Sequence, residues 1–317
     1  MSQHTLPHNL QLPPRGAYCE LAALIGLRLL GSQLDLGRRK RALNQLTGPN
    51  KSSFRGRGID FEEVRGYQAG DDIRSIDWRV TARTGSAHTK LFREERERPV
   101  LIAIDQRNSL FFGSRHCFKS VLAAHLGALL AWSALDRGDR VGALLFNGTE
   151  HREIRPRRSR RNVLAILSAI TEYNHRLPLA ASASDGSFSD MLGHLRRVAR
   201  PGSSIYLISD FHNAARDGAS EHLYQLARHC EITAMACHDP LEQELPRAGV
   251  YAVTDGQQRA QLSTADANLR RKFAEQARAE AGQLAEDLQR LGIPLLAFST
   301  TSAPFPLLQH YYGAGKH

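Results

Sequence analysis

From residue 100 onwards the chain alternates short apolar runs with amphipathic stretches, and this alternation restricts the possible fold more than any other feature. Apolar runs typical of buried strands occur at residues 100–105, 140–147, 203–211, 231–238 and 293–300. Helical patterns occur at residues 119–135, 160–171, 190–200, 221–230 and 266–291. Because strands that alternate with helices form a mostly parallel sheet covered on both faces, we expect a doubly wound α/β domain.

The sequence before residue 100 has a different texture. Residues 1–46 predict a polar tail and a helical arm broken near Gly31, and residues 47–99 predict a small β-rich module of short strands and tight loops. Residues 100–317 then form the α/β domain. The apolar run at 21–30 is too short to span a bilayer, so we expect no membrane span.

Composition limits the classes of partner. The chain has 317 residues, of which 42% are hydrophobic, and a net charge of +10 with the positive excess in its first two thirds. Such basic faces suit an acidic protein, a phosphate polymer or an anionic membrane. The four cysteines are scattered, which predicts a cytoplasmic location without a disulfide framework.

Two aspartates end predicted strands and mark the candidate binding site. Asp105 follows one apolar run and Asp210 follows another, with Ser109 and Ser189 in nearby loops. In an open α/β sheet, ligands bind beyond the carboxyl ends of the strands. Carboxylates and hydroxyls without His or Cys form an oxygen set that Mg²⁺ prefers.

The residues after the first of these strands resemble a known metal signature. Asp105-Gln106-Arg107-Asn108-Ser109 matches the D-x-S-x-S pattern of von Willebrand factor A-like domains at its first and last positions. Ser189 stands where that fold usually has a Thr. Arg107 occupies the position of a ligating Ser, and a guanidinium has no lone pair to donate. We therefore expect a degenerate site without metal or other cofactor, with bound Mg²⁺ as the alternative.

A longer stretch carries a more specific resemblance. The sequence GRGIDFEEVRGYQAGDDIRSIDWRVTART, followed by KLFREERERPVLIAID, resembles the hallmark of the bacterial family called domain of unknown function 58. Members of that family are associated with MoxR-type AAA+ ATPases. The resemblance therefore implies an adaptor that works beside such an ATPase in the assembly or activation of other complexes.

The charged part of this stretch is open to three interpretations: a catalytic site, a structural clamp and part of a partner-binding surface. Its carboxylates could serve a metal-dependent hydrolase, but arginines interleave with them and would lower their pKa, which makes them poor proton donors. A structural clamp built from Arg–carboxylate pairs and apolar anchors explains the pattern more simply. The residues of this motif are Arg65, Tyr67, Gly70, Asp71, Asp72, Arg74, Asp77, Trp78 and Arg83.

A second basic feature is the segment RPRRSRR, which contains Arg155, Arg157, Arg158, Arg160 and Arg161. It can be a solvated loop, a contact for an acidic protein surface, or a contact for nucleic acid. Nucleic acid is the least favoured partner because aromatic residues are not interleaved with the arginines.

Taken together, these patterns predict a non-enzymatic protein-interaction module with a MoxR-type AAA+ ATPase as its partner. Asp105, Arg107, Ser109, Ser189 and Asp210 are expected to form the partner-binding rim, where Arg107 could receive a partner carboxylate. The alternatives are a von Willebrand-type module that binds its partner through a divalent metal and, less favoured, a metal-dependent hydrolase.

Overall fold

The computed structural model describes residues 12–37, 60–68, 76–93, 99–177, 187–214, 218–254 and 259–313. The chain divides into two compact units. Residues 53–98 form the smaller unit, and residues 1–52 together with 99–317 form the larger one. The N-terminal helical arm, which we expected as a separate segment, therefore belongs to the same unit as the α/β sheet.

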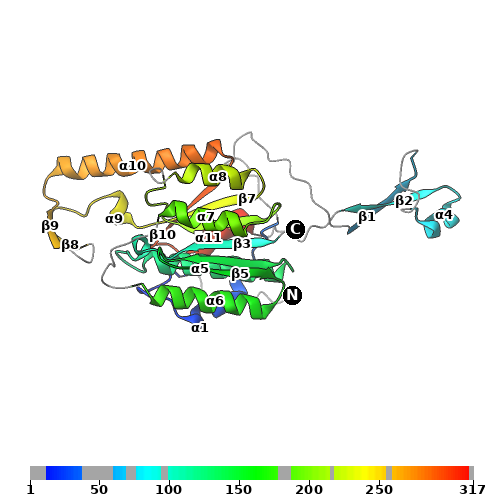
Figure 1. Cartoon of the computed structure of the whole chain (residues 1–317), viewed down its shortest axis with the longest axis horizontal. Coiled ribbons are helices and arrows are strands. Elements are labelled where there is room, and N and C mark those ends of the chain that lie inside the picture. The colour runs from blue at the N-terminus through cyan, green and yellow to red at the C-terminus, as the bar shows by residue number, and fades with distance from the viewer. Residues whose placement is uncertain are drawn as a thin grey trace. The chain divides into compact units, whose positions relative to one another are not determined.

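The smaller unit contains β1 (Asp60–Gly66), α4 (Trp78–Thr84) and β2 (His88–Arg93). The larger unit contains α1 (Leu21–Gly26), α2 (Arg28–Gly31), β3 (Val100–Asp105), the 3-10 turn η3 (Asn108–Leu110), α5 (Lys119–Asp136), β4 (Val141–Phe146), β5 (His151–Arg157), α6 (Arg160–His175), α7 (Phe188–Val198), β6 (Ser204–Ser209), α8 (Ala219–Ala227), β7 (Glu231–His238), α9 (Pro240–Gln243), β8 (Val250–Thr254), β9 (Arg259–Ser263), α10 (Ala267–Arg290), β10 (Leu295–Ser299) and α11 (Pro304–Tyr312). Figure 1 shows these elements along the chain.

A six-stranded sheet in the order β10-β7-β6-β3-β4-β5 forms the centre of the larger unit. All neighbouring pairs are parallel except β4 with β5, which is antiparallel and places β5 at one edge. From β3 the chain first builds outward through β4 and β5, and then returns to the other side of β3 with β6. The expected doubly wound, mostly parallel sheet with helices on both faces is confirmed.

Successive residues of the central strands face opposite layers of helices. Ile102 and Ile104 of β3 join the hydrophobic cluster that contains α5, α6 and α11, whereas Leu101 and Ala103 join the cluster that contains α7 and α8. Every residue of β3 is buried. This explains why the strand reads as a continuous apolar run, because a parallel strand covered on both faces has no solvent side.

The N-terminal helices α1 and α2 pack on α5. The Trp132 indole donates a hydrogen bond of 3.1 Å to the Leu24 carbonyl, and the Ser133 hydroxyl donates one of 2.9 Å to the Leu34 carbonyl. A Cβ atom on Gly31 would lie 2.7 Å from Trp132 Cβ. The absence of a side chain at Gly31 therefore allows the two helices to approach closely.

The smaller unit is an antiparallel pair, β1 with β2, whose connection carries α4. This short helix was not expected from the sequence. Asp77 caps it, because Asp77 Oδ1 accepts hydrogen bonds of 3.0 and 3.2 Å from the backbone N–H groups of Arg79 and Val80. Trp78, expected as a buried apolar anchor, is 68% exposed, because the first turn of α4 presents it to solvent.

The structure describes only part of the motif to which the clamp hypothesis applies. Asp77 acts as a helix cap, and Arg83 lies exposed in the last turn of α4. Gly70, Asp71, Asp72 and Arg74 lie outside the described residues. The side chain of Arg65 in β1 is also not described, and the clamp remains a prediction for the motif as a whole.

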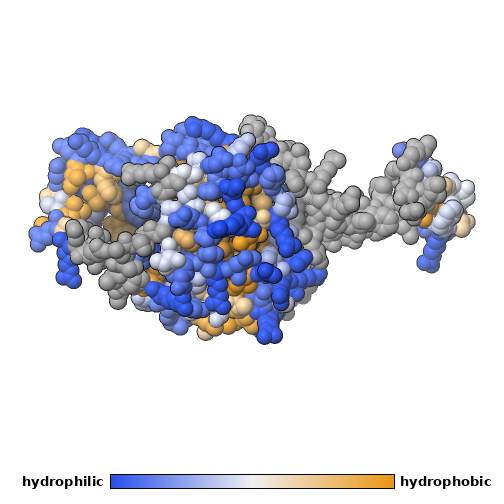
Figure 2. All heavy atoms as spheres, viewed as in Figure 1, coloured by the Kyte–Doolittle hydropathy of each residue, from blue (hydrophilic) through white to orange (hydrophobic). Residues whose placement is uncertain are grey.

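The long helix expected near residues 266–291 is present as α10, and the expected hairpin before it is present as β8 and β9. Leu288 is the one buried residue of α10. Leu269 is 38% exposed and Val250 of the hairpin is 70% exposed. Figure 2 shows the corresponding hydrophobic area at the end of the unit where β8, β9 and the start of α10 lie. Among the described helices, none is long and apolar enough to cross a membrane.

Candidate functional site

The candidate site lies where the strand order of the sheet reverses. β3 and β6 are parallel neighbours, with Ile104 in register with Ile208. Asp105 ends β3, and Asp210 directly follows Ser209, the last residue of β6. Both aspartates therefore reach the same edge of the sheet, at the switch point where open α/β sheets bind their ligands.

Arg107 neutralises Asp105 within the crevice. Its Nε donates hydrogen bonds of 3.1 and 3.0 Å to the two carboxylate oxygens of Asp105, and one terminal nitrogen donates another of 2.8 Å to Oδ2. The backbone N–H of Arg107 adds a fourth, of 2.9 Å, to Oδ1. The Ser209 hydroxyl donates a further hydrogen bond of 2.7 Å to Oδ2. Both oxygens of Asp105 are thus occupied by donors from the chain itself.

Burial sets the electrostatics of this pair. The side chains of Asp105 and Arg107 are 0% and 3% exposed. Burial raises the pKa of the Asp105 carboxyl above its ordinary value, and the Arg107 guanidinium opposes that rise. The Asp105 carboxylate therefore depends on Arg107 to stay ionised.

Lys119 supplies a second buried cation, which the sequence analysis missed. It begins α5, and its Nζ lies 2.9 Å from Asp210 Oδ2 and 2.5 Å from Glu242 Oε1. Burial alone would lower the pKa of Lys119, but its attraction to Asp210 and Glu242 outweighs burial and raises the pKa. The lysine is therefore held in its charged form.

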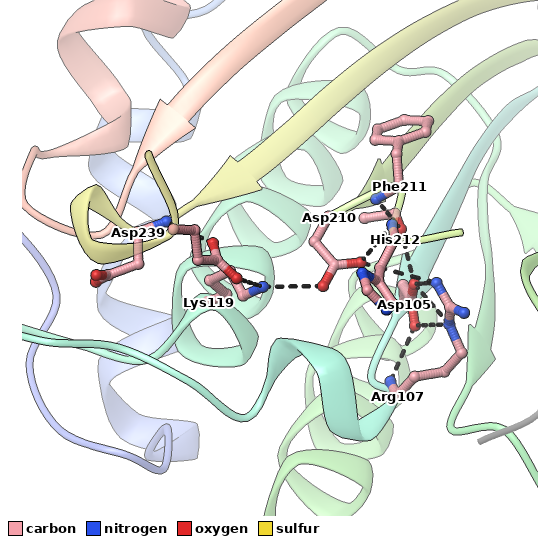
Figure 3. A network of polar contacts seen from close by, with 9 residues as sticks. Asp105, Arg107, Lys119, Asp210, Phe211, His212 and Asp239 are labelled. Atoms are coloured by element: carbon pink, nitrogen blue, oxygen red, sulfur yellow. Dashed lines mark hydrogen bonds and ion pairs between the residues drawn. The ribbon is translucent and has the colours of Figure 1, made fainter. Parts of the chain in front are cut away.

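Asp210 is the point at which the two cations meet. Its Oδ1 lies 3.8 Å from an Arg107 terminal nitrogen, while its Oδ2 contacts Lys119. Burial would raise the pKa of Asp210, but the charge and hydrogen bond of Lys119, with help from the His212 N–H and Arg107, lower it below its ordinary value. These contacts form a chain of alternating charges from Asp105 through Arg107, Asp210 and Lys119 to Glu242. Figure 3 shows the first four of these residues.

The outer end of this chain of charges is attached to the loop after β7. Glu242 is 37% exposed and lies in α9, where its Oε2 also accepts a hydrogen bond of 2.9 Å from the Asp239 N–H. Asp239 in turn accepts hydrogen bonds from the Thr300 hydroxyl and the Ser114 N–H, at 2.5 and 2.8 Å. Loops that follow β3, β7 and β10 are therefore fixed to one another at this edge.

Aromatic side chains pack against Arg107. The Arg107 guanidinium carbon lies 5.5 Å from the centre of the Phe188 ring, and Phe188 packs against Phe211 with ring centroids 5.4 Å apart. Phe211 has a φ of 55°, a left-handed conformation that is rare for an aromatic residue and costs about 1–3 kcal/mol. The Phe211 N–H donates a hydrogen bond of 3.0 Å to the Ser209 hydroxyl, which helps to hold this turn.

The structure corrects two expectations about the rim. Arg107 is buried and fully engaged with Asp105, so it does not present its guanidinium to a partner carboxylate. Ser187 rather than Ser189 begins α7, because its hydroxyl accepts the Asp190 N–H, and the residue of this turn that faces Arg107 is Phe188. Ser109 is near Arg107 in sequence, and its buried Oγ has no hydrogen-bond partner among the described residues.

This donor set does not fit a divalent cation. Two fixed positive charges already neutralise Asp105 and Asp210, and the carboxylate oxygens point to guanidinium, ammonium and hydroxyl donors. A metal ion would have to displace these donors and would meet the charge of Arg107 and Lys119 at short range.

The basic segment lies away from this crevice. Arg155 and Arg157 belong to β5, Arg158 follows it, and Arg160 and Arg161 begin α6. Because Arg157 is paired with Val141, the first residue of β4, this end of β5 lies at the amino edge of the parallel strands. Asp105 lies at the opposite, carboxyl edge.

The family-model comparison matches residues 63–283 to "Protein of unknown function DUF58". The chain belongs to this DUF58 family. It is also 30% identical over 268 residues to uncharacterized proteins of Mycobacterium bovis and Mycobacterium tuberculosis, covering 84% of this chain and 83% of each relative. The DUF58 membership confirms the family suggested by the sequence around residues 56–105.

Similar solved structures include BatB from Bacteroides thetaiotaomicron (15% identity, TM-score 0.35, covering 61% of this chain and 98% of that chain). An aerotolerance-related membrane protein from Bacteroides fragilis has 13% identity and a TM-score of 0.42, covering 68% and 98%. The VWA domain of Rpn10 has 9% identity and a TM-score of 0.33, covering 67% and 94%.

Proposed function

We propose that this DUF58 protein is a non-enzymatic protein-interaction module that works in the cytoplasm as the partner of a MoxR-type AAA+ ATPase, in the assembly or activation of other complexes. The observation that carries the proposal is the neutralisation of both crevice aspartates by Arg107 and Lys119. In an enzyme of this fold class, such strand-end carboxylates would be free to bind metal or to move protons. Here each is bound to an internal cation.

The pKa values of two buried groups, Asp210 and Lys119, support a non-enzymatic role. A general acid or base needs a pKa near the working pH. The pKa of Asp210 is lowered and that of Lys119 is raised, which moves both groups away from neutrality. These two shifts suit a rigid recognition edge better than proton transfer, whereas burial raises the pKa of Asp105. The choice of an ATPase partner rests on what the sequence resemblance to this family implies.

The partner contact on this edge must use groups that reach solvent. Phe112, in the loop between η3 and α5, is 40% exposed, and Glu242 is 37% exposed at the end of the chain of charges. Arg107, Asp105 and Asp210 are buried at the same edge of the sheet. We propose that they act as positioning residues for the exposed loops.

Calorimetric titration with Mg²⁺ and Mn²⁺ tests the metal-free character of the module. We expect no binding heat in the wild-type protein. Binding that is present in the wild type and vanishes in Asp105→Ala would overturn this part of the proposal.

Capture of a purified MoxR-type AAA+ ATPase from the same organism, with and without ATP, tests the partner. We expect capture by the wild-type protein that survives a chelator, because no ion takes part. Failure to capture the ATPase in either nucleotide state would overturn the proposed partner.

One observation favours the divalent-metal alternative. The buried Ser109 Oγ lacks a hydrogen-bond partner among the described residues, although it sits at the last position of the D-x-S-x-S pattern. If this hydroxyl served a metal, chelation would abolish partner capture and Ser109→Ala would weaken metal binding. Both readouts separate this alternative from the proposed metal-free module.

A further inference from the structure

The five arginines Arg155, Arg157, Arg158, Arg160 and Arg161, here called the arginine patch, form a concentrated positive surface. All five are exposed. Within the part of the chain that the structure describes, none of their side chains has an ion-pair partner. Two other arginines close to them in sequence or structure are neutralised: Arg152 lies 2.8 Å from Glu172, and Arg176 lies 3.1 Å from Glu150. The arginines of the patch therefore carry uncompensated positive charge, whereas Arg152 and Arg176 do not.

The backbone that carries the arginine patch is held in place. The Asn162 side-chain amide donates hydrogen bonds of 2.7 Å to the Val141 carbonyl and 3.2 Å to the Arg155 carbonyl. The Ser159 hydroxyl caps α6 by accepting the Asn162 N–H at 3.2 Å. The guanidiniums therefore project from a fixed frame, which lowers the entropy lost when a ligand binds.

Two members of the patch stand where local electrostatics disfavours them. Arg160 and Arg161 occupy the first turn of the 16-residue helix α6, which contains no acidic residue in that turn. The positive end of the helix dipole repels cations at this position. By contrast, α7 and α9 carry Asp190 and Glu242 in their first turns. Residues that break a local rule without an internal compensation are typical of functional surfaces.

The patch faces a different direction from the crevice. Arg157 is paired with Val141 at the amino edge of the sheet, and the exposed Arg140 directly precedes Val141. Asp105 and Asp210 lie at the carboxyl edge. A ligand on the patch would therefore not cover the carboxyl edge of the sheet. Figure 1 shows β5 and α6 side by side in the larger unit.

We propose that the arginine patch binds an acidic segment of a protein partner. Guanidiniums match carboxylates in a bidentate geometry, and the adjacent start of α6 adds further attraction for anions. Nucleic acid fits less well, because the exposed large hydrophobic residues among the described ranges include none between residues 137 and 161 that could stack on bases. Glu153 and Glu150 also limit the length of the positive surface along β5.

Addition of the partner as an extra strand is disfavoured. β5 is an edge strand, but it contains Pro156 and an irregularity in its pairing with β4 between Val141 and Ala143. Proline and local irregularity both oppose strand addition at an edge. The acidic segment is therefore held by side chains and not by a backbone ladder.

This inference rests on the proposed function only in taking the partner to be a protein. Its test measures the fluorescence anisotropy of a labelled glutamate-rich peptide, with a glutamine-rich peptide of equal length and single- and double-stranded DNA as comparison probes. We expect the wild-type protein to bind the glutamate-rich peptide more tightly than the DNA, with an affinity that falls as salt increases. The triple variant Arg157→Gln/Arg158→Gln/Arg161→Gln should weaken peptide binding by about tenfold.

The matched control removes the same number of charges from α10. The variant Arg271→Gln/Lys272→Gln/Arg278→Gln changes three exposed residues of the same unit and should leave peptide binding within about twofold of the wild type. Replacement of the three patch arginines by lysine should restore part of the affinity, which a folding defect would not permit. Thermal unfolding of each variant verifies that it is folded.

Three results would overturn the inference: no binding of the glutamate-rich peptide, equal loss in the α10 control, or tighter binding of DNA that depends on the patch. The last result would assign the patch to nucleic acid. This test and the tests of the proposed function can fail independently. The metal titration and the ATPase capture do not use the patch variants.

Discussion

Lys119 Nζ lies 2.9 Å from Asp210 Oδ2, and this contact joins the start of α5 to the end of β6 across 91 residues of sequence. Both side chains are nearly inaccessible to solvent, at 2% and 5% exposure. A buried ion pair of this kind adds little net stability compared with apolar residues, but removal of one partner leaves an unpaired buried charge. Loss of either side chain would therefore leave an unpaired buried charge at the carboxyl edge of the sheet.

Lys119→Met should lower the free energy of unfolding by about 3–5 kcal/mol, because Asp210 would lose the cation that offsets its burial. Urea denaturation at neutral pH measures the change. Lys272→Met, on the exposed face of α10, serves as the control and should change stability by less than about 0.5 kcal/mol. Equal effects of the two variants would contradict the assigned role of Lys119.

Ser209→Ala should destabilise the protein by about 1–3 kcal/mol. The variant removes the hydroxyl that donates to Asp105 Oδ2 and accepts from the Phe211 N–H, and it leaves buried groups without partners. Chemical denaturation measures the loss. Ser263→Ala in the exposed strand β9 is the comparison and should be close to neutral. A neutral Ser209→Ala would show that the left-handed Phe211 turn does not need this hydroxyl.

Gly31→Ala should lower stability by about 1–3 kcal/mol, because the new Cβ would lie 2.7 Å from Trp132 Cβ and 3.0 Å from the Leu129 carbonyl oxygen. Gly26 offers a matched control, since a Cβ there meets nothing within 4 Å. Gly26→Ala should be neutral or stabilising by up to about 1 kcal/mol. Melting temperatures of the two variants should therefore move in opposite directions or differ clearly in size.

His125 should make stability dependent on pH in the mildly acidic range. His125 is half-buried in α5, and the desolvation at this position lowers its pKa to about 4. The unfolded chain takes up a proton near its ordinary pKa of about 6.5, while the folded protein resists until about pH 4, so stability falls as the pH decreases through this window. Between about pH 7 and about pH 5 the contribution amounts to up to about 2 kcal/mol.

Urea denaturation at these two pH values tests this effect. His125→Gln should show a smaller loss between them than the wild type, whereas the exposed His310→Gln should not. An unchanged loss in His125→Gln would assign the pH dependence to other groups.

The sequence predicted the location of the candidate site but not its full set of contacts. Asp105 and Asp210 were identifiable because each directly follows an apolar run, and parallel strands bring such residues to one edge. Arg107 was identifiable because it interrupts a local pattern. The contacts of Lys119 with Asp210 and Glu242 span 91 and 123 residues, so no local spacing signals them. A single lysine at the start of an otherwise apolar helix was the available clue.

The same limit explains the errors in the charged motif and at the rim. Trp78 was expected to be buried because of its size and hydrophobicity, but its position in the first turn of α4 leaves it exposed. Arg107 was expected to reach a partner, but its exposure depends on Phe188, which packs over it from a distant helix. Both outcomes depend on the placement of neighbouring elements, which residue type alone does not encode.

The hydrogen bond from Trp132 to Leu24 has a consequence for synthesis of the chain. Its two residues are 108 positions apart, and residues 53–98, which form the smaller unit, lie between them. At translation rates of about 5–20 residues per second, α1 and α2 emerge from the ribosome about 5–20 s before the helix that covers them. During that interval the nascent chain exposes Leu24, Leu27 and Leu30, which are buried in the folded protein, to solvent.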